Sequence, residues 1–228
     1  MVSTRKRTAR SAKGTEVRIL RAAEKVFGKK GFADATIDQM VELAGVSRGT
    51  FYLYFQDKDQ VFATLVSQTV AELFQVSNRR NVGSLRDRIE ISTRHFLEAF
   101  QRHRGILRCL FEVDHYKPNI ARLHRKLRSN FIGRIRNHLE RNLARGICPP
   151  MNTRVAAFAL GLMCEAVANS WLSGGFEPWA KPFEFDEVVQ ELTDLWCRAA
   201  YKDGIGAMMP AAERAAGSPV NKQPQVAG

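Results

Sequence analysis

The residues best suited to chemistry lie on a short segment from Arg48 to Phe55. At helical spacing Phe51 and Phe55 point inward together, so an arginine, a threonine and two tyrosines lie mostly on the outer faces. In a DNA major groove an arginine can read guanine, a threonine can meet a thymine methyl group, and a tyrosine hydroxyl can hold a phosphate. A glycine among them allows close backbone approach. The segment therefore predicts a DNA-contacting surface made of Arg48, Gly49, Thr50, Tyr52 and Tyr54.

Two short helices joined by a tight turn would hold these side chains in place. Thr36 and Gln39 have the spacing of a capping box that starts the first helix. Gly45 supplies the left-handed residue that ends it, and Ser47 is placed to cap a second helix over 48–55. One face of the first helix is apolar through Ile37, Met40, Val41 and Ala44.

The segment GVSRGTFYLYFQDKDQVF, with AAEKVFGKKGFADAT upstream, resembles the DNA-binding motif of the TetR family of transcriptional repressors. The resemblance is specific from Glu16 to Phe62. Histidine is commoner than tyrosine at the position of Tyr54, and some members have a bulkier aromatic residue where Leu53 stands, so the base preference there stays open. The resemblance implies DNA contacts by Thr36, Ser47, Arg48, Gly49, Thr50, Tyr52, Tyr54 and Lys58, with Thr36 and Lys58 on phosphates.

The remaining chain shows apolar residues at helical spacing and no competing strand pattern. We expect an all-α fold of about nine helices, with a three-helix head carrying the helix-turn-helix over 14–57 and a larger helical body over 58–202. Beyond the helix-turn-helix, helices are expected at 15–30, 58–78, from 84 and from 105 onward, and at 118–145, 152–171 and 186–201.

The two ends of the chain differ from its centre in composition. Residues 1–13 hold five Lys or Arg and no acid, and residues 203–228 are rich in Ala, Gly and Pro, so we expect both to be disordered. The first is either an arm that contacts phosphates or a minor groove, or a solvated tail. No secretory signal is apparent. We therefore expect a cytoplasmic protein.

Membrane and metal sites are not expected. No apolar run reaches the length of about 18 residues that a membrane span needs. The four cysteines form no C-x-x-C pair, which argues against a metal site. Cys148 precedes two prolines, so we expect it to be the exposed cysteine.

The resemblance also implies a body that dimerises through its last two helices and holds a small-molecule pocket. Small residues in the helix expected at 152–171 would let two helices approach closely in a two-fold dimer, and burial within one subunit is the alternative. The interface is assigned to Ala159, Leu160, Val167, Val189, Leu192 and Trp196. The pocket is assigned to Phe96, Phe100, Cys109, Phe111, Glu112, Phe158, Met163, Glu165, Asn169 and Trp171, although such side chains are also common in cores or on surfaces.

Positive charge is concentrated in two regions of this chain of net charge +12. One is the head. The other, residues 79–145, holds 17 Lys or Arg and 6 Asp or Glu. Many of these cations spread around the helix expected at 118–145. They form either a solvated outer face or a site for an anionic ligand, such as the phosphates of an acyl-coenzyme A.

The motifs of the sequence distinguish three classes of function. An enzyme is not supported, because the sequence has no H-E-x-x-H, no G-x-S-x-G and no Gly-rich phosphate loop. A non-specific architectural DNA binder would not need a large apolar body. We expect a regulator without a cofactor that binds a two-fold operator in double-stranded DNA as a homodimer. The expected mode is a repressor released by a hydrophobic or amphipathic small molecule, with an activator or a co-repressor-dependent regulator as the alternative.

Overall fold

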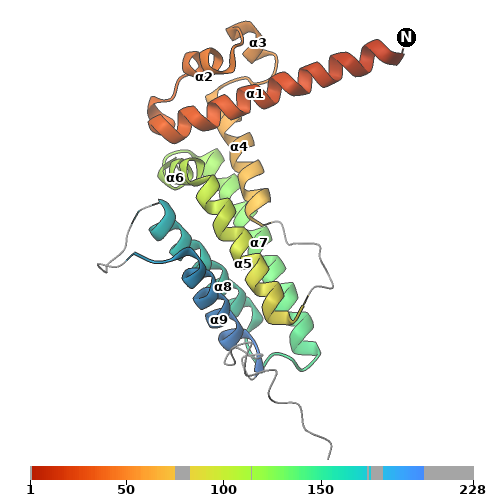
Figure 1. The fold of residues 1–228 in the computed structure, drawn as a ribbon, viewed down its shortest axis with the longest axis vertical. Coiled ribbons are helices and arrows are strands. Elements are labelled where there is room, and N and C mark those ends of the chain that lie inside the picture. The colour runs from red at the N-terminus through yellow and green to blue at the C-terminus, as the bar shows by residue number, and fades with distance from the viewer. Residues whose placement is uncertain (1, 75–82, 114, 174, 176–181, 203–228) are drawn as a thin grey trace, which may run out of the picture.

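Helices make up all regular structure in the ranges that the computed structural model describes, residues 2–74, 83–113, 115–173, 175 and 182–202 (Figure 1). The head consists of α1 (Val2–Asp34), α2 (Ile37–Ala44) and α3 (Arg48–Tyr52). The body consists of α4 (Lys58–Leu73), α5 (Leu85–Arg102), α6 (Arg104–Val113), α7 (Pro118–Ala144), α8 (Thr153–Ala168), the π-helical turn η1 (Asn169–Ser173) and α9 (Phe185–Ala200). The all-α prediction is confirmed.

An aromatic core holds the head together. The rings of Phe27, Phe32 and Phe62 are buried and in mutual contact, with centroids 5.0 Å apart between Phe32 and Phe62. Gly31 bends α1 just before Phe32 with a φ of 78°, a conformation that glycine adopts without steric cost. Because Phe62 belongs to α4, the core of the head is completed by the first helix of the body.

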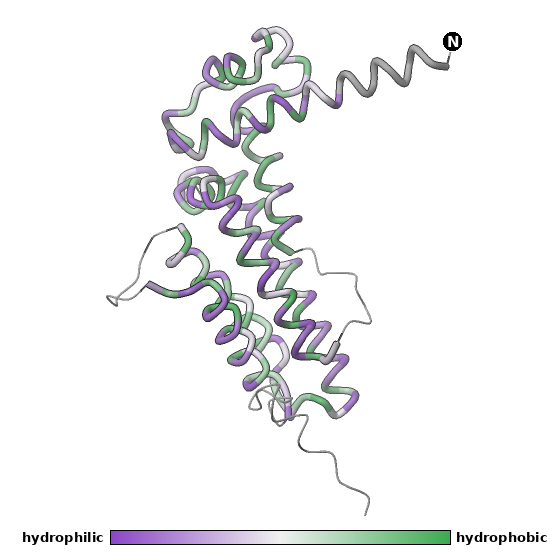
Figure 2. Tube along the Cα trace, viewed as in Figure 1, coloured by the Kyte–Doolittle hydropathy of each residue, from purple (hydrophilic) through white to green (hydrophobic). Residues whose placement is uncertain are grey.

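The long helix α4 runs from the head into the body (Figure 1). Asp57 caps it by accepting a hydrogen bond from the amide of Gln60 at 2.7 Å. Its buried residues continue from Val61 and Phe62 in the head to Val70 and Leu73 in the body. Figure 2 shows hydrophobic residues recurring along this helix. One rigid element therefore contributes to both parts of the molecule.

The body is a bundle in which α5 packs on α9 and α7 packs on α8. Beside the apolar contacts, Arg86 of α5 links to α9 through half-buried polar bonds. Its Nη2 donates to Asp194 Oδ1 at 2.7 Å and to Gln190 Oε1 at 2.8 Å. Charge-assisted hydrogen bonds of this kind fix the relative register of two helices.

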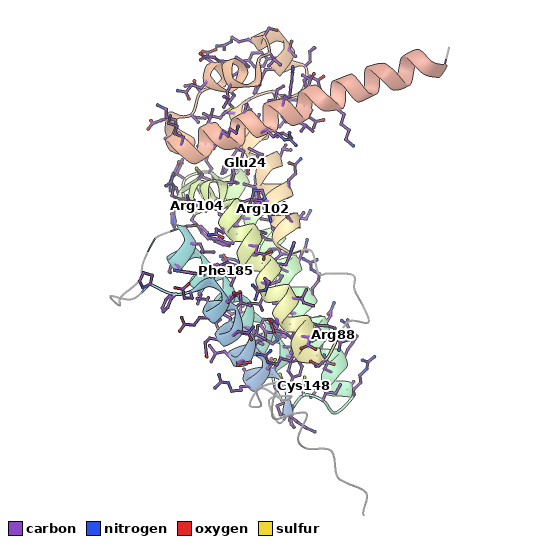
Figure 3. All side chains as sticks on the ribbon, viewed as in Figure 1. Glu24, Arg88, Arg102, Arg104, Cys148 and Phe185 are labelled. Carbon is purple, nitrogen blue, oxygen red and sulfur yellow. The ribbon has the colours of Figure 1, made fainter. Side chains whose placement is uncertain are left out.

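The head meets the body where α1 crosses α6. Gly28 and Gly105 bring the two backbones so close that a Cβ added at Gly105 would lie 2.7 Å from the Cα of Gly28. Beside this contact, His103 Nδ1 lies 2.7 Å from Glu24 of α1 and its Nε2 lies 3.0 Å from Glu72 of α4. Figure 3 places Glu24, Arg102 and Arg104 at this junction. The hydrogen bond to Glu24, with a second to Glu72, raises the pKa of His103 although burial opposes the charge.

Several expected boundaries differ in the structure. Helix α1 continues back to Val2, where we expected a disordered arm over 1–13; residues 2–13 contain no Pro or Gly to stop a helix and are rich in good helix formers. The expected recognition helix ends at Tyr52, because the amides of Leu53 and Tyr54 bond three residues back, in a tighter turn. The expected eighth helix passes into the π-helical turn at Asn169. The tail 203–228 and residues 75–78 lie outside the described residues.

Cys148 is buried, with only 1% of its surface exposed, so the prediction that it is the exposed cysteine is wrong. The loop that carries it is closed over by the end of α9, where the amide of Lys202 donates to the Ile147 carbonyl at 3.0 Å. Burial raises the pKa of its thiol.

One segment in the described chain, Thr153–Ser173, has the length and mean hydropathy (1.5) of a membrane span. These two properties alone are weak evidence, because a core helix of a water-soluble protein shares them. The segment also contains Glu165, which forms an ion pair with Arg128 of α7. Within the most apolar 18-residue window of the segment, 28% is buried inside the chain.

The close contact of Gly28 with Gly105 yields a first prediction. Gly105→Ala should lower the free energy of unfolding by about 1–3 kcal/mol, because the new methyl group overlaps the backbone of α1. Gly133→Ala is the matched control: nothing lies within 4 Å of its added Cβ, so it should raise the stability of α7 by about 0.5–1 kcal/mol. Urea unfolding followed by circular dichroism measures both. Equal effects of the two substitutions would refute the close contact.

Candidate nucleic-acid interface and body cavity

The predicted helix-turn-helix forms as its sequence signals indicate. Thr36 and Gln39 make a reciprocal capping box, and Gly45 adopts the left-handed conformation with φ 63°. Ser47 caps α3 by accepting from the amide of Thr50 at 3.0 Å. Behind this surface, Phe51 and Phe55 are buried, as predicted. The capping bonds leave α3 projecting from the head with its outer face in solvent (Figure 1).

The outer face of α3 carries the predicted contact residues. Ser47, Arg48, Gly49 and Tyr52 are exposed, and Thr50 and Tyr54 are partly buried. The hydroxyls of Ser47 and Thr50 lie 2.9 Å apart and hydrogen-bond to each other. Thr36 is exposed at the start of α2. These residues lie together at one end of the molecule, and their roles toward DNA stay predictions.

Arg48 is held by a partner that sequence reasoning missed. Its guanidinium forms an ion pair with Asp38 of α2, and Nη2 donates to the Tyr52 hydroxyl at 3.4 Å. Both charged side chains are more than half exposed, so the pair contributes little to stability and can exchange for another acceptor. Asp38 therefore orients Arg48 across the turn without locking it. The ten-residue separation gave no sequence signal for this contact.

Gly49 and Leu53 have no internal explanation on this face. A Cβ added at Gly49 would meet no atom nearer than 3.8 Å, so the fold itself does not require glycine there, and a helical glycine costs about 1 kcal/mol relative to alanine. Leu53 is 82% exposed. A glycine kept for close approach and an apolar side chain left in water both suit a surface that another molecule covers.

In the structure Lys58 contacts backbone carbonyl groups, whereas the sequence predicted a contact with a DNA phosphate. Its ammonium donates to the carbonyl oxygens of Phe32, Ala33 and Ala35 at 2.8, 3.1 and 2.9 Å and lies 4.7 Å from the centre of the Phe32 ring. These three bonds use all three protons of the ammonium group. Burial lowers the pKa of Lys58. In this structure Lys58 joins the start of α4 to the end of α1.

A cavity of about 630 Å³ lies at the junction of head and body, and a larger one of about 940 Å³ lies inside the body. We call the second the body cavity. Leu73 and Phe74 of α4 contribute to its wall, and the Phe74 ring stacks on Phe131 with centroids 3.8 Å apart. The remaining apolar lining is Leu85, Ile89, Ile91, Phe96, Ile135, Cys164 and Trp196.

Polar groups gather on one part of the body cavity. His138 Nε2 lies 2.7 Å from the Tyr201 hydroxyl and 3.0 Å from the Asn142 amide nitrogen. Burial, with Arg141 and Arg88 nearby, lowers the pKa of His138, so its ring is neutral near pH 7. Four arginines also line the cavity, and none forms an ion pair among the described residues: Arg88, Arg134, Arg141 and Arg145.

The structure brings only part of the predicted pocket together. Phe96 lines the body cavity, whereas Phe100 and Cys109 are buried in the core. Phe111 packs on the His124 ring, and Glu165 pairs with Arg128. Glu112 and Phe158 are exposed outside the cavity. Met163, Asn169 and Trp171 are partly buried away from it. Periodicity identified apolar faces but not which helices leave space between them.

The predicted dimer residues are mostly internal. Leu160, Val189, Leu192 and Trp196 are buried within one chain, so they are not available to a partner, while Ala159 is exposed and Val167 is partly buried. The outward apolar residues of α8 and α9 are different ones. Val155 and Phe158 of α8 and Leu195 of α9 are 62%, 53% and 45% exposed, next to the exposed Ala159, Ala166 and Ala199. We call these six residues the α8–α9 face.

The three bonds of Lys58 yield a second prediction. Lys58→Ala should lower the free energy of unfolding by about 1–3 kcal/mol, because it leaves part-buried carbonyls without a donor. Lys29→Ala, at an exposed position of α1, should have little effect. If Lys58 instead contacted a phosphate, its loss would reduce the slope of log affinity against log salt by about 1. We expect no change in that slope, and a reduced slope with unchanged stability would contradict the structural role.

Comparison with known proteins identifies the family of the DNA-binding head and full-length relatives of the chain. The profile of the family described as bacterial regulatory proteins, tetR family, matches residues 19–65. The HTH-type transcriptional regulator EthR of Mycobacterium tuberculosis is 28% identical over 208 residues, which cover 86% of this chain and 92% of EthR. The HTH-type regulator YdgC of Bacillus subtilis is 43% identical over 58 residues, 25% of this chain and 30% of YdgC.

The same fold occurs in solved structures. A TetR-like transcriptional regulator from Rhodococcus sp. RHA1 superposes with a TM-score of 0.61 at 24% identity, over 81% of this chain and 94% of that one. The matched residues 19–65 contain the whole helix-turn-helix, and the similarity to EthR extends through the body. Residues 19–65 therefore carry the DNA-binding domain of the tetR family of bacterial regulatory proteins, and the whole chain is similar to HTH-type transcriptional regulators in sequence and fold.

Proposed function

We propose that this protein is a repressor that binds a two-fold operator sequence-specifically and is released by an amphipathic small molecule. The observation that carries the proposal is the outer face of α3. It presents an arginine and a glycine without an internal reason, with an exposed leucine just after them, on a short helix capped by Ser47. The relatives described above are named as regulators, which argues against an enzyme. A DNA-binding repressor also implies a cytoplasmic location.

A two-fold dimer through the α8–α9 face supports this function. A single five-residue helix reads few bases, and two heads joined by a two-fold axis read two half-sites. The α8–α9 face offers exposed Val155, Phe158 and Leu195 with small residues between them. Apolar side chains in contiguous exposure mark protein–protein contacts.

The body cavity fits an effector with an apolar part and an anionic group. Its volume of about 940 Å³ falls in the range of small-molecule sites. The apolar wall includes stacked phenylalanines, and the four arginines have no carboxylate partners among the described residues. Unpaired guanidinium groups favour carboxylate or phosphate ligands. An acyl-coenzyme A or a long-chain carboxylate has this combination.

The link between cavity and DNA is α4. Leu73 and Phe74 at its end line the body cavity, and Phe62 near its start completes the core of the head. An effector that displaces the end of α4 therefore tilts the head and changes the spacing of two recognition helices. Because the DNA fixes the half-site spacing, the effector can release DNA only if it binds the displaced state more tightly.

The third prediction tests DNA readout. Arg48→Ala should weaken binding to the cognate site by about 1–3 kcal/mol and relax specificity at the base it contacts. Arg122→Ala, in the exposed surface of α7, is a matched loss of charge far from α3. Footprinting and fluorescence anisotropy on the promoter region of its own gene measure both. The groove assignment fails if the two variants footprint alike.

The fourth prediction concerns assembly. Phe158→Arg should convert a dimer into monomers and sharply reduce operator affinity, because it places a charge in the α8–α9 face without touching the core. Tyr116→Arg changes a similarly exposed aromatic residue elsewhere on the body and should leave the dimer intact. Light scattering at micromolar concentration measures the oligomeric state of both variants. A monomeric wild-type protein would remove the dimer from the proposal.

The fifth prediction concerns the effector. Mass spectrometry of the denatured, purified protein should identify co-purified acyl or other amphipathic anions, and titrating them should release the operator. Arg141→Ala should raise the concentration for half-release about tenfold, as expected for a lost charge-assisted contact. Arg125→Ala, also exposed on α7 but outside the body cavity, should leave that concentration unchanged. Ligands that fill the body cavity but leave DNA affinity unchanged would refute coupling through α4. Ligands that strengthen operator binding would instead favour a co-repressor-dependent regulator.

A further inference from the structure

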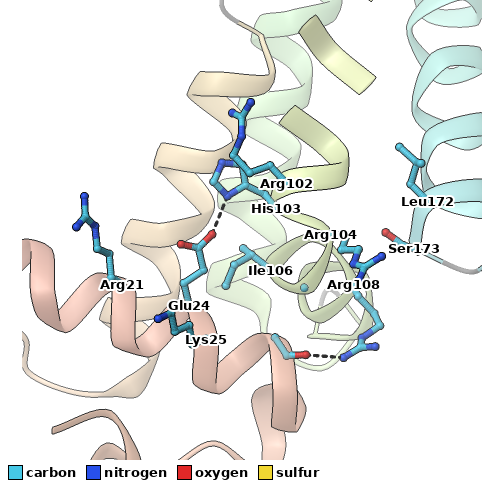
Figure 4. Close-up of a pocket in the computed structure, with 12 residues that line it drawn as sticks. Arg21, Glu24, Lys25, Arg102, His103, Arg104, Ile106, Arg108, Leu172 and Ser173 are labelled. Atoms are coloured by element: carbon cyan, nitrogen blue, oxygen red, sulfur yellow. Dashed lines mark hydrogen bonds and ion pairs between the residues drawn. The ribbon is translucent and has the colours of Figure 1, made fainter. Parts of the chain in front are cut away.

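The cavity at the junction of head and body lies between α1, the start of α6 and η1 (Figure 4). We call it the junction cleft. Its volume of about 630 Å³ suits a small molecule. It is separate from the body cavity, since the two share no lining residue. Helix α1 also separates it from α2 and α3, which lie on the other side of that helix (Figure 1).

The junction cleft is strongly cationic. One carboxylate lines it, that of Glu24, which is already bound to His103 at 2.7 Å. Five basic side chains line it from three elements: Arg21 and Lys25 of α1, Arg102 of α5, and Arg104 and Arg108 of α6. Arg102 pairs with Glu72, and Arg108 donates to the Gly28 carbonyl at 3.0 Å. Arg21, Lys25 and Arg104 form no ion pair among the described residues. Like charges gathered without counter-ions repel each other, and a bound anion would relieve this repulsion.

Two further features of the junction cleft are relevant to an anion. The hydroxyl oxygen of Ser173 is shielded from water and has no hydrogen-bond partner among the described residues, although Ser173 lines the cleft. Figure 4 shows Ser173 on the side of Arg104 and Arg108. The first turn of α6, Arg104 to Ile106, also lines the cleft, so the positive end of its helix dipole contributes there. A buried hydroxyl without a partner is uncommon and calls for a ligand or water.

We propose that the junction cleft is a binding site for a small polyanion that carries adjacent phosphate groups, such as pyrophosphate or a nucleoside diphosphate. Arg104 would bind the anion from the body, beside Ser173, and Lys25 and Arg21 would attract it from the head. Tetrahedral phosphate oxygens accept from several directions at once, which suits donors on three separate elements. The proposal does not rest on the effector assigned to the body cavity.

Such an anion would bridge the close contact between head and body. Arg104 is next to Gly105, whose backbone touches Gly28, and Lys25 lies three residues before Gly28 on α1. An anion held between Lys25 and Arg104 therefore resists separation of α1 from α6. The junction cleft thus adds a second input that biases the head, reached from a different side of the molecule than the body cavity.

Isothermal titration of the full-length protein with pyrophosphate, without DNA and at constant ionic strength, tests the site. We expect one site per chain and a rise in the melting temperature on binding. The double variant Lys25→Gln with Arg104→Gln should weaken affinity at least about tenfold, because it removes two charge-assisted contacts. Arg122→Gln with Arg125→Gln removes the same charge from the exposed surface of α7 and should change affinity less than about twofold. Equal weakening in both double variants would show only general attraction and overturn the proposal.

Two more variants guard against loss of folding and a wrong location. Arg104→Glu places a carboxylate among the cations at an exposed position, and should abolish pyrophosphate binding without lowering the melting temperature. Arg141→Ala in the body cavity should leave pyrophosphate affinity unchanged, and a loss there would place the anion in the wrong cavity for this proposal. Adenosine diphosphate is titrated in parallel to distinguish a nucleoside diphosphate from inorganic pyrophosphate. If it binds more tightly than pyrophosphate, the rest of the cleft is assigned to the nucleoside. If it binds more weakly, the site is assigned to the inorganic ion. Unchanged affinity in both junction-cleft variants would overturn the site.

Discussion

The structure depends on the apolar burial of a single helix, α4. Val61 and Phe62 at one end are wholly buried in the head, and Val70 and Leu73 at the other end are buried in the body. Removing a buried phenylalanine from such a core costs about 3–5 kcal/mol, so neither end can detach cheaply. Because a helix transmits displacement along its axis, motion at the body cavity must either move the head or break one of these cores. If the proposed effector displaces the end of α4 at the body cavity, the displacement therefore reaches the head.

The head is not attached through α4 alone. The Gly28–Gly105 contact allows α1 to lie directly on α6, and glycine on both sides removes the side chains that would hold the helices apart. Around it, His103 bridges Glu24 of α1 and Glu72 of α4, and the Lys117 ammonium lies 5.3 Å from the centre of the Phe32 ring. These are polar, partly exposed bonds, which are weaker than the cores on either side. A tight backbone contact ringed by weak polar bonds suits a pivot better than a rigid joint.

Local signals in the sequence predicted the helix-turn-helix well because its energetics are local. The Thr36–Gln39 capping box, the left-handed Gly45 and the Ser47 cap each depend on residues within three positions, and each is present. Lys58 could not be placed in this way, since its three acceptors lie 23 to 26 residues away. The dimer assignment failed in part for a related reason. Helix α8 is apolar on most sides, and hydrophobicity alone does not tell whether α7, α9 or a second chain covers Leu160 or Phe158.

In the Arg-rich stretch 79–145, the positions of the charges matter more for binding an anion than their number. On α7, Arg136 pairs with Glu140 and Arg128 with Glu165, so part of the excess is neutralised inside the chain. Of the cations without carboxylates among the described residues, Arg122 and Arg125 lie on the exposed surface of α7, and two other groups line cavities. Arg88, Arg134, Arg141 and Arg145 face the body cavity, and Arg21, Lys25 and Arg104 face the junction cleft. Like charges held close together repel each other, and a bound anion would relieve that repulsion. If anions were to set the position of the head, the fold would need two such groups of cations. One lines the junction cleft beside the head, and the other lines the body cavity at the far end of α4.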